Sequence, residues 1–185
     1  MRLEPLGQEH DAGLWAVAQD PELWRWTAPG TDASRRAFGS WLRAALTASE
    51  AGTEHAFATR SLASGELVGS TRFLALRPDD RGLEIGWTWL ARAAQGTGIN
   101  VEAKRLMLAH AFEQLACLRV ELKTHAANER SRGAMTRLGA SFEGVHRKHR
   151  VVPGLGVRDT AWFSVVDDEW PRVRAGLDAR LAAPS

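Results

Sequence analysis

The amino-acid sequence predicts an α/β fold in which one mixed sheet is flanked by helices. Three observations support this prediction. Seven short segments have the pattern of strands, helix-like segments with an apolar stripe stand between them, and a glycine-containing turn at residues 95–100 joins a strand-like run to a helix-like run. At 185 residues the chain is long enough for one domain, residues 1–185, with a substantial buried core.

The first half of the chain is expected to contain four strands and two helices. Thr31 or Asp32 is expected to cap the second helix, because either side chain can accept a hydrogen bond from its first turn. Ala63, Ser64 and Gly65 form the turn of a hairpin between the second and third strands. The predicted strands are 2–6, 55–60, 66–76 and 83–90, and the predicted helices are 8–18 and about 32–49, with a short turn at 21–26.

The second half is expected to contain three more strands and three helices. Asp167 is expected to cap the last of these helices. The strands are 119–125, 141–151 and 157–166, and the helices are 101–115, 128–138 and 170–181. The order of elements therefore indicates a mixed sheet covered by helices.

Charge and composition argue against a nucleic-acid partner. The 24 basic residues are interleaved with 22 acidic ones, so the net charge is only +2 and no basic stripe is formed. The pI of 9.2 is high because a chain with no Tyr and few Lys titrates little just above neutral pH. The basic cluster at residues 147–150 is interpreted as a solvated strand end or the rim of a ligand site.

Other features of the sequence bear on the cellular location of the protein and on metal binding. It contains no apolar run of the roughly 20 residues that cross a bilayer and no signal peptide, so no membrane association is expected. Cys117, the one cysteine, lies in an apolar stretch and is interpreted as a buried, inert thiol. A reducing, cytoplasmic location is the expectation. The histidines (His110, His125, His146 and His149) lack metal-ligand spacing, so no metal is expected.

The turn from Gln95 to Asn100 is the segment whose chemistry is most specific. A turn that opens a helix presents unpaired backbone N–H groups and the positive end of the helix dipole, which suits a phosphate. Gly96 and Gly98 lack the Cβ atoms that would keep a diphosphate away. The P-loop motif and the third glycine of the dinucleotide fingerprint are both missing. The turn by itself leaves two interpretations: it binds a phosphate-bearing ligand, or it is a glycine-rich connection between strand and helix that binds no ligand.

Three motifs resemble the GNAT superfamily of N-acetyltransferases, in its RimJ/RimL-like branch. Gln95 and Gly98 match the loop pattern [QR]-x-x-G-x-[GA], whereas Asn100 departs from its last position. Residues 84–87, Glu-Ile-Gly-Trp, resemble the strand before that loop, and residues 128–144 resemble the block N-x-x-S…L-G-[FA]-x-x-E-G. The resemblance covers about residues 1–175. It implies a largely antiparallel, seven-stranded GNAT fold and acetyl-CoA as cofactor.

The resemblance also assigns cofactor-binding roles. Pantetheine is expected beside the strand from Trp87 to Leu90, with a backbone N–H near Trp89 or Leu90 facing the thioester carbonyl. Asn128 is expected to cap its helix, to contact pantetheine, or to do both. The diphosphate loop comprises Gln95, Gly96, Thr97, Gly98, Ile99 and Asn100.

Two residues are candidates for catalysis. Glu84 is the candidate general base; the alternatives are an exposed strand carboxylate or an ion-pair partner. Many GNAT enzymes use a tyrosine to protonate the leaving thiolate, and this chain has none, so Ser131 or a water is expected to supply that proton. At pH 7 a lysine amine costs about 3 kcal/mol more to neutralise than an α-amine. A single carboxylate therefore favours an α-amine acceptor.

The acceptor and the partners are less constrained. Trp24 and Trp26 are expected either in the wall of the acceptor site or in the core. The predicted function is acetyl transfer by direct attack of an amine, with a protein or peptide N-terminus as acceptor. A small-molecule amine as acceptor and a non-catalytic acyl-CoA-binding module are the alternatives. The resemblance also makes a homodimer possible.

Overall fold

The computed structural model describes residues 1–26, 33–152 and 156–183, and it contains a mixed sheet of seven strands. The strand order is β1-β2-β3-β4-β5-β7-β6, in which β4 and β5 are parallel and the other neighbours are antiparallel. The predicted fold class is therefore confirmed. The strands are β1 (Arg2–Pro5), β2 (His55–Arg60), β3 (Leu67–Arg77), β4 (Gly82–Leu90), β5 (Arg119–His125), β6 (Ser141–Val152) and β7 (Gly156–Val166).

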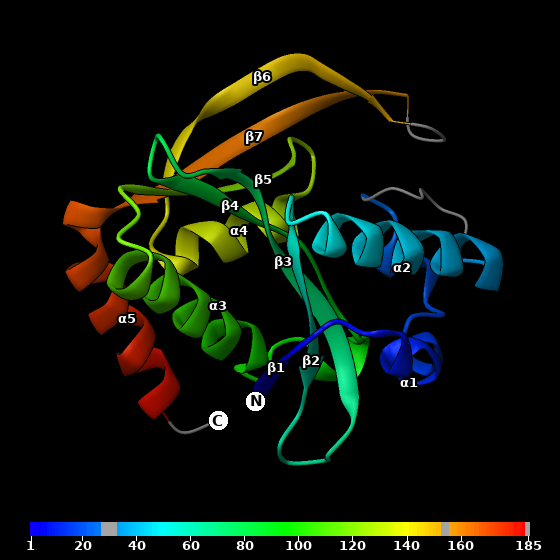
Figure 1. The fold of residues 1–185 in the computed structure, drawn as a ribbon. Coiled ribbons are helices and arrows are strands. Elements are labelled where there is room, and N and C mark those ends of the chain that lie inside the picture. Colours follow the sequence, from blue (N-terminus) through cyan, green and yellow to red (C-terminus); the bar gives the residue numbers. More distant parts are fainter. Residues whose placement is uncertain (27–32, 153–155, 184–185) are drawn as a thin grey trace.

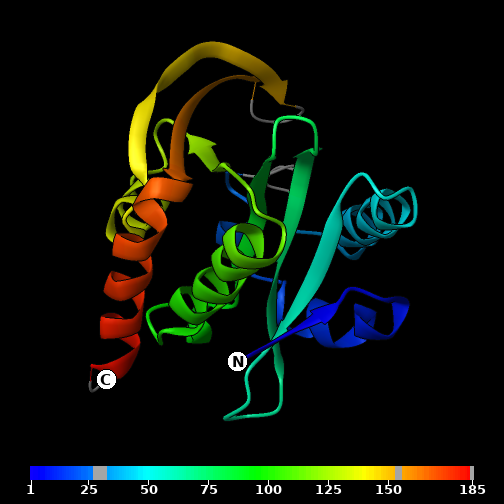
Figure 2. The ribbon, with the colours of Figure 1, turned by 60° about the vertical axis from the view of Figure 1, so that its left-hand side comes forward.

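Helices cover both faces of the sheet (Figure 1). Figure 2 shows α1 (Asp11–Val17) and α2 (Arg35–Glu50) on one face, and α3 (Ile99–Ala109) and α5 (Trp170–Ala182) on the other. The two large hydrophobic clusters lie one under each pair of helices, and a third, small cluster contains Val68, Leu90 and Ala94. The α4 helix (Glu129–Leu138) follows β5, and none of the described helices is long and apolar enough to cross a membrane.

A β-bulge interrupts β4 and reverses the direction of its side chains. Arg72 of β3 pairs with Gly86 and Ser70 pairs with Trp89, so that two residues of β4 oppose one residue of β3. Trp87, inside the bulge, has a φ of 50°. Leu83 and Ile85 therefore pack into the core under α3 and α5, whereas Trp87 and Trp89 both pack against the core under α1 and α2.

The β4 and β5 strands separate soon after they meet. Their pairing covers only residues 82–84 with residues 119–121, while β5 stays paired with β7 along its whole length. Beyond Glu84, β4 has no strand neighbour on this side among the described residues. This open edge runs along the bulge toward the turn at residues 95–100. An unpaired strand edge can bind an extended ligand through backbone hydrogen bonds.

Four predicted helix starts need correction. The first helix, expected over residues 8–18, begins as a 3-10 turn, Gln8–His10, and is α-helical only from Asp11 to Val17. Ser34 caps α2, with its Oγ accepting a hydrogen bond from the Ala37 N–H at 3.1 Å; Thr31 and Asp32 lie outside the described residues. Asp167 does not cap α5, because a 3-10 turn, Asp167–Glu169, comes first. The α3 helix begins at Ile99 instead of residue 101, because Gly98 takes the left-handed conformation before it. It continues as a π-helical turn, His110–Gln114.

Candidate active site

The turn before α3 has the backbone that a phosphate cradle requires. Gly96 and Gly98 have φ values of 82° and 84°, a region that residues with a side chain adopt at a cost. A Cβ atom at either glycine would meet no atom within 4 Å, so the space above both is open. The Thr97 hydroxyl donates to the carbonyl of Ala94 at 2.8 Å and braces the turn. The first N–H groups of α3 thus face an open surface.

The Gln95 side chain connects three elements. Its Nε2 donates to the Leu90 carbonyl at the end of β4, and its Oε1 accepts from Arg130 of α4, both at 2.8 Å. Gln95 therefore holds the turn against β4 and α4 through its side chain. Sequence reasoning missed Arg130, since nothing local in the sequence indicates that it reaches a residue 35 positions away.

Asn128 and Ser131 lie in the first turn of α4. The Asn128 Oδ1 accepts the Ser131 N–H at 3.1 Å, which confirms the predicted helix cap. The Ser131 side chain is half-buried, and its hydroxyl has no hydrogen-bond partner among the described residues. That hydroxyl is free to donate to a ligand. The contact of Asn128 with pantetheine stays a prediction.

Asn100 departs from the family's loop pattern, and its side chain lies in the first turn of α3. Its amide oxygen is buried and has no hydrogen-bond partner among the described residues. An Asn side chain at this position has to point away from a diphosphate bound to the turn, and the buried amide oxygen is compatible with that direction.

Glu84 is a buried carboxylate on β4, just before the strands separate. It is 2% exposed, and Lys123 Nζ of β5 lies 2.5 Å from its Oε2. Burial raises the pKa of Glu84, while the charge of Lys123 lowers it and that of Glu121 raises it. The expectation of an exposed carboxylate is therefore wrong, and the ion pair is present. A raised pKa makes the carboxylate a better proton acceptor, which suits a general base.

Aromatic rings lie beside the Glu84–Lys123 pair. Lys123 Nζ is 4.9 Å from the centre of the Trp162 ring of β7, a cation–π contact. At the end of β5 the half-buried Trp26 ring contacts His125 at 4.7 Å between centres. We call this side of β4, β5 and β7, defined by Glu84, Lys123 and Trp162, the Glu84 face. Trp26 is thus placed beside it.

Trp24, in contrast, belongs to the core under α1 and α2. Its side chain is 2% exposed, and its Nε1 donates to the carbonyl of Ala18 at 2.7 Å. The rings of Phe38, Trp41 and Trp89 surround it at 5.3 to 6.4 Å between centres. The expectation that Trp24 lines the acceptor wall is corrected, because an enclosed ring has no surface to offer a substrate.

A buried lysine occupies the other side of β4. Lys104 of α3 is 5% exposed, and its Nζ donates to the hydroxyls of Thr88, at 2.6 Å, and Thr71, at 3.2 Å. Burial lowers its pKa to about 7. We call this side, defined by Lys104, Thr71 and Thr88, the Lys104 face. The signal was present in the sequence, because residue 104 falls on the apolar stripe of its helix, between residues 101 and 108.

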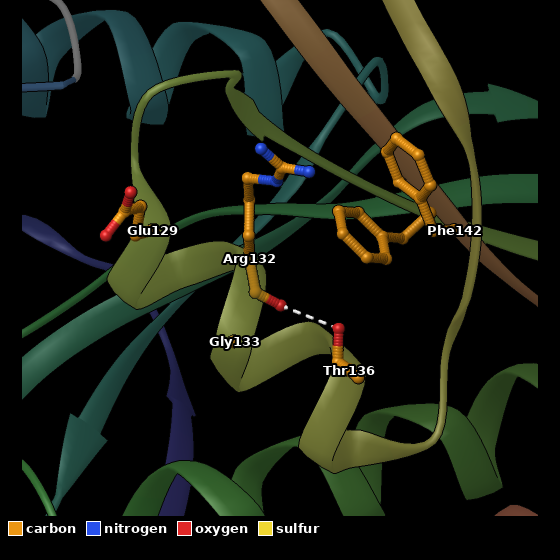
Figure 3. A pocket seen from close by; sticks show the side chains of 6 residues that line it. Glu129, Arg132, Gly133, Thr136 and Phe142 are labelled. Atoms are coloured by element: carbon orange, nitrogen blue, oxygen red, sulfur yellow. Dashed lines mark hydrogen bonds between the residues drawn. The ribbon is translucent and has the colours of Figure 1, made fainter.

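A surface hollow of about 390 Å³ lies elsewhere, between α4 and β6. Figure 3 shows the Arg132 side chain of α4 beside Phe142 of β6, and its guanidinium lies 5.4 Å from the centre of that ring. The Thr136 hydroxyl donates to the carbonyl of Arg132, and the Glu129 side chain points away from Phe142. Gly133 and Phe163 complete the lining, and no residue with a predicted role belongs to it. The residues with a predicted role lie instead on β4, on the turn at residues 95–100, at the start of α4 and, for Trp26, at the end of β5, whereas Trp24 lies in the core.

The chain belongs to the GNAT acetyltransferase family. The family model described as "Acetyltransferase (GNAT) domain" matches residues 1–141. GNAT acetyltransferases use acetyl-CoA. The open loop at residues 95–100 and the unpaired edge of β4 fit a ligand that carries both a diphosphate and an extended amide chain.

Particular relatives agree with this family. A GCN5-related N-acetyltransferase from Brucella melitensis is 34% identical, with a TM-score of 0.89 over 98% of this chain and 82% of that one. YdaF of Bacillus subtilis (strain 168), provisionally named a ribosomal N-acetyltransferase, is 34% identical over 109 residues, which are 59% of this chain and 58% of YdaF. Mycobacterium smegmatis RimJ, in complex with CoA-disulfide, shares the fold at 22% identity, with a TM-score of 0.79 over 96% of this chain and 88% of that one.

Proposed function

We propose that this chain is an acetyl-CoA-dependent N-acetyltransferase whose acceptor is an N-terminal α-amine of a protein or peptide. The observation that carries the proposal is the position of Glu84, a buried carboxylate at the point where β4 and β5 separate. The open edge of β4 connects this point to the loop at residues 95–100. One continuous edge therefore offers a proton acceptor at one end and a diphosphate cradle at the other.

The proposed steps assign one task to each group. Glu84 takes a proton from the ammonium form of the acceptor, so that the neutral amine attacks the thioester carbonyl directly. Backbone N–H groups near Trp89 and Leu90 stabilise the negative charge that develops on the carbonyl oxygen. Ser131 donates its hydroxyl proton to the departing thiolate and is reprotonated, through water, by the second proton that the nitrogen loses as the amide forms. The bound acetyl-CoA supplies the activated acetyl group.

Two arguments favour an α-amine over a lysine amine. The pKa of an α-amine is near 8 and that of a lysine is near 10.4, so neutralising lysine at pH 7 costs about 3 kcal/mol more. Glu84 is one carboxylate and shares its site with the positive charge of Lys123, which opposes a second cation. The provisional name of YdaF, a ribosomal N-acetyltransferase, is compatible with an acceptor that belongs to a protein.

Mass spectrometry of two matched peptides tests the proposal. One peptide has a free N-terminus and no lysine, and the other has a blocked N-terminus and one lysine. We expect acetylation of the first at least about tenfold faster, given the difference in amine pKa. Acetylation of the lysine alone would reject the α-amine, and acetyl-CoA binding by calorimetry without transfer to any amine would identify a non-catalytic acyl-CoA-binding module.

Location and assembly are further parts of the proposal. A cytoplasmic location rests on the single thiol of Cys117, which is buried. The homodimer rests on the family resemblance, and light scattering on the full chain tests it. We also propose that no nucleic acid is bound, which a binding assay at low salt checks.

A further inference from the structure

Arg158 lies on the Glu84 face, next to the proposed acceptor site. Trp162 of β7 pairs with Lys123 of β5, and Thr160 pairs with His125. Because side chains alternate along a strand, Arg158 points to the same face as Thr160 and Trp162. It lies two residues beyond the Thr160–His125 pair, which brings it to the end of β5.

The Arg158 guanidinium has no counterion in the described part of the chain. Its side chain is half-buried, its Nε is buried without a hydrogen-bond partner, and it takes part in none of the ion pairs of the described residues. Burial lowers the pKa of Arg158, and the nearby charge of Arg150 lowers it further, while Glu84 raises it. An unpaired cation in such a place is unfavourable, which indicates that a ligand supplies the missing anion.

The other charged groups around Arg158 do not neutralise it. Glu84 of β4 is engaged with Lys123 of β5, and the Asp159 Oδ1 accepts the backbone N–H of Lys148. Arg150 of β6 pairs in register with Arg158 and adds positive charge. The remaining titratable groups are His125 of β5 and His149 of β6, whose pKa values are lowered mainly by burial, which favours their neutral forms.

We propose that Arg158 binds a carboxylate that the acceptor carries close to its amino group, and that this contact selects acidic acceptors. The inference rests on the proposed function, because Glu84 holds the amine on the same face. A guanidinium suits the task, since its planar fork matches a carboxylate through two parallel hydrogen bonds. The carboxylate belongs either to the side chain of an N-terminal Asp or Glu or to a free amino acid.

Steady-state kinetics on matched acceptors tests the proposal. One pair is a peptide that starts with Asp and the same peptide starting with Asn; the other is a free amino acid and its amide. In at least one pair, we expect kcat/KM for the acceptor that carries the carboxylate to be about tenfold or more higher than kcat/KM for its amide counterpart. The favoured pair identifies the source. Equal kcat/KM within both pairs overturns the proposal.

Variants assign the preference to Arg158. Arg158→Gln is expected to remove it by raising KM for the acidic acceptor with little change in kcat, and Arg158→Lys is expected to keep part of it. Arg150→Gln, at an exposed neighbouring position, is the control and keeps most of it. Acetyl-CoA affinity stays unchanged in all three. A preference that survives Arg158→Gln, or a loss of acetyl-CoA binding in that variant, contradicts the proposal.

A binding measurement separates this inference from the proposed function. Calorimetric titration of the same acceptors into the full chain, with CoA present, requires no turnover. Tighter binding of the acidic acceptor, lost in Arg158→Gln, supports the subsite even if no acetyl transfer occurs. Equal binding overturns it even if transfer occurs. Thermal melting of Arg158→Gln checks the fold, and an unpaired cation predicts a melting temperature equal to or above that of the wild type.

Discussion

The two faces of β4 handle a buried charge in opposite ways. On the Glu84 face, the carboxylate meets the ammonium group of Lys123 at 2.5 Å. On the Lys104 face, the hydrogen-bond partners of the lysine within the described residues are the hydroxyls of Thr71 and Thr88. An ion pair keeps both of its groups charged, whereas a buried lysine without an anion is driven toward its neutral form. Along β4, the bulge at Trp87 lies after Glu84 and next to Thr88. It reverses the alternation of side chains, so that Glu84 and Thr88 point to opposite faces.

This difference separates a chemical role from a structural one. Glu84 keeps a charge at the open edge of β4, where an acceptor amine can be deprotonated. Lys104 is enclosed between α3 and the sheet, and its two threonine contacts connect α3 to β3 and to the bulge of β4. The comparison predicts that changes on the Glu84 face alter activity first and that changes on the Lys104 face alter stability first.

The largest effect is expected from Glu84→Gln, which keeps the shape of the side chain and removes the base. Loss of a general base lowers kcat/KM by about 100-fold or more. Glu121→Gln is a matched control, because Glu121 is the register partner of Glu84 on β5 and has its own ion pairs with Arg77 and Arg119. Equal losses in the two variants, measured by release of free CoA, would reject the assignment of Glu84.

Lys104→Met tests the other face through stability. The folded-state pKa of about 7 lies below the value in the unfolded chain, so the unfolded chain binds the proton more tightly between pH 7 and 10. The free energy of unfolding of the wild type should therefore rise with pH in this window, by up to about 1.4 kcal/mol per pH unit from this group. Urea denaturation at pH 7 and pH 9 measures it.

Lys104→Met lacks this titration, so its free energy of unfolding does not rise with pH in the same way. The free energy of unfolding of the variant minus that of the wild type should therefore be about 2 kcal/mol or more lower at pH 9 than at pH 7. Thr71 and Thr88 remain bonded to each other at 2.8 Å without the lysine. A constant difference between the two proteins at both pH values would contradict a lowered pKa for Lys104.

Gly98→Ala tests the loop with a smaller effect. The positive φ of Gly98 makes any side chain cost about 1 kcal/mol, and the added methyl group lies in the proposed diphosphate cradle. We expect the Kd for acetyl-CoA to rise about tenfold. Gly52→Ala is the control: Gly52 has a φ of 69° and open space around it, but it lies in the turn after α2. An equal rise in the Kd for acetyl-CoA in both variants would contradict the assignment of residues 95–100 as the diphosphate-binding loop.

The smallest effect is expected from Ser131→Ala. Because water can also protonate the thiolate, kcat should fall by at most about tenfold with KM unchanged. Within the described part of the chain the Ser131 hydroxyl makes no hydrogen bond, and the contact with Asn128 uses the backbone N–H of Ser131. The melting temperature should therefore stay constant. A kcat reduced 100-fold would show that Ser131 is the main proton donor.

Much of the architecture follows from local sequence, whereas most of the side-chain contacts that build the site do not. The order of strands and helices along the chain and the Asn128 cap depend on patterns within a few residues, and the structure confirms them. The burial of Trp24 depends on three rings from distant segments, and the contact of Gln95 with Arg130 joins residues 35 positions apart. Such contacts are set by the way distant segments pack together, which local patterns in a single sequence do not specify.

The Lys123 partner of Glu84 illustrates the same limit. Both residues stand in predicted strands, but only the parallel pairing of β4 with β5 brings their side chains together. An ion pair was one of the alternatives for Glu84, but the identity of its partner and the burial of the carboxylate could not be predicted before that register was known.

The pH dependence of kcat/KM, compared between the wild type and Glu84→Gln, tests the central claim most directly. Burial raises the pKa of Glu84, so wild-type kcat/KM should fall as the pH drops through an apparent pKa above the ordinary glutamate value of 4.5. This acid limb should be absent in Glu84→Gln, whose remaining activity should still fall as the acceptor amine becomes protonated. An identical acid limb in both proteins would show that Glu84 is not the base.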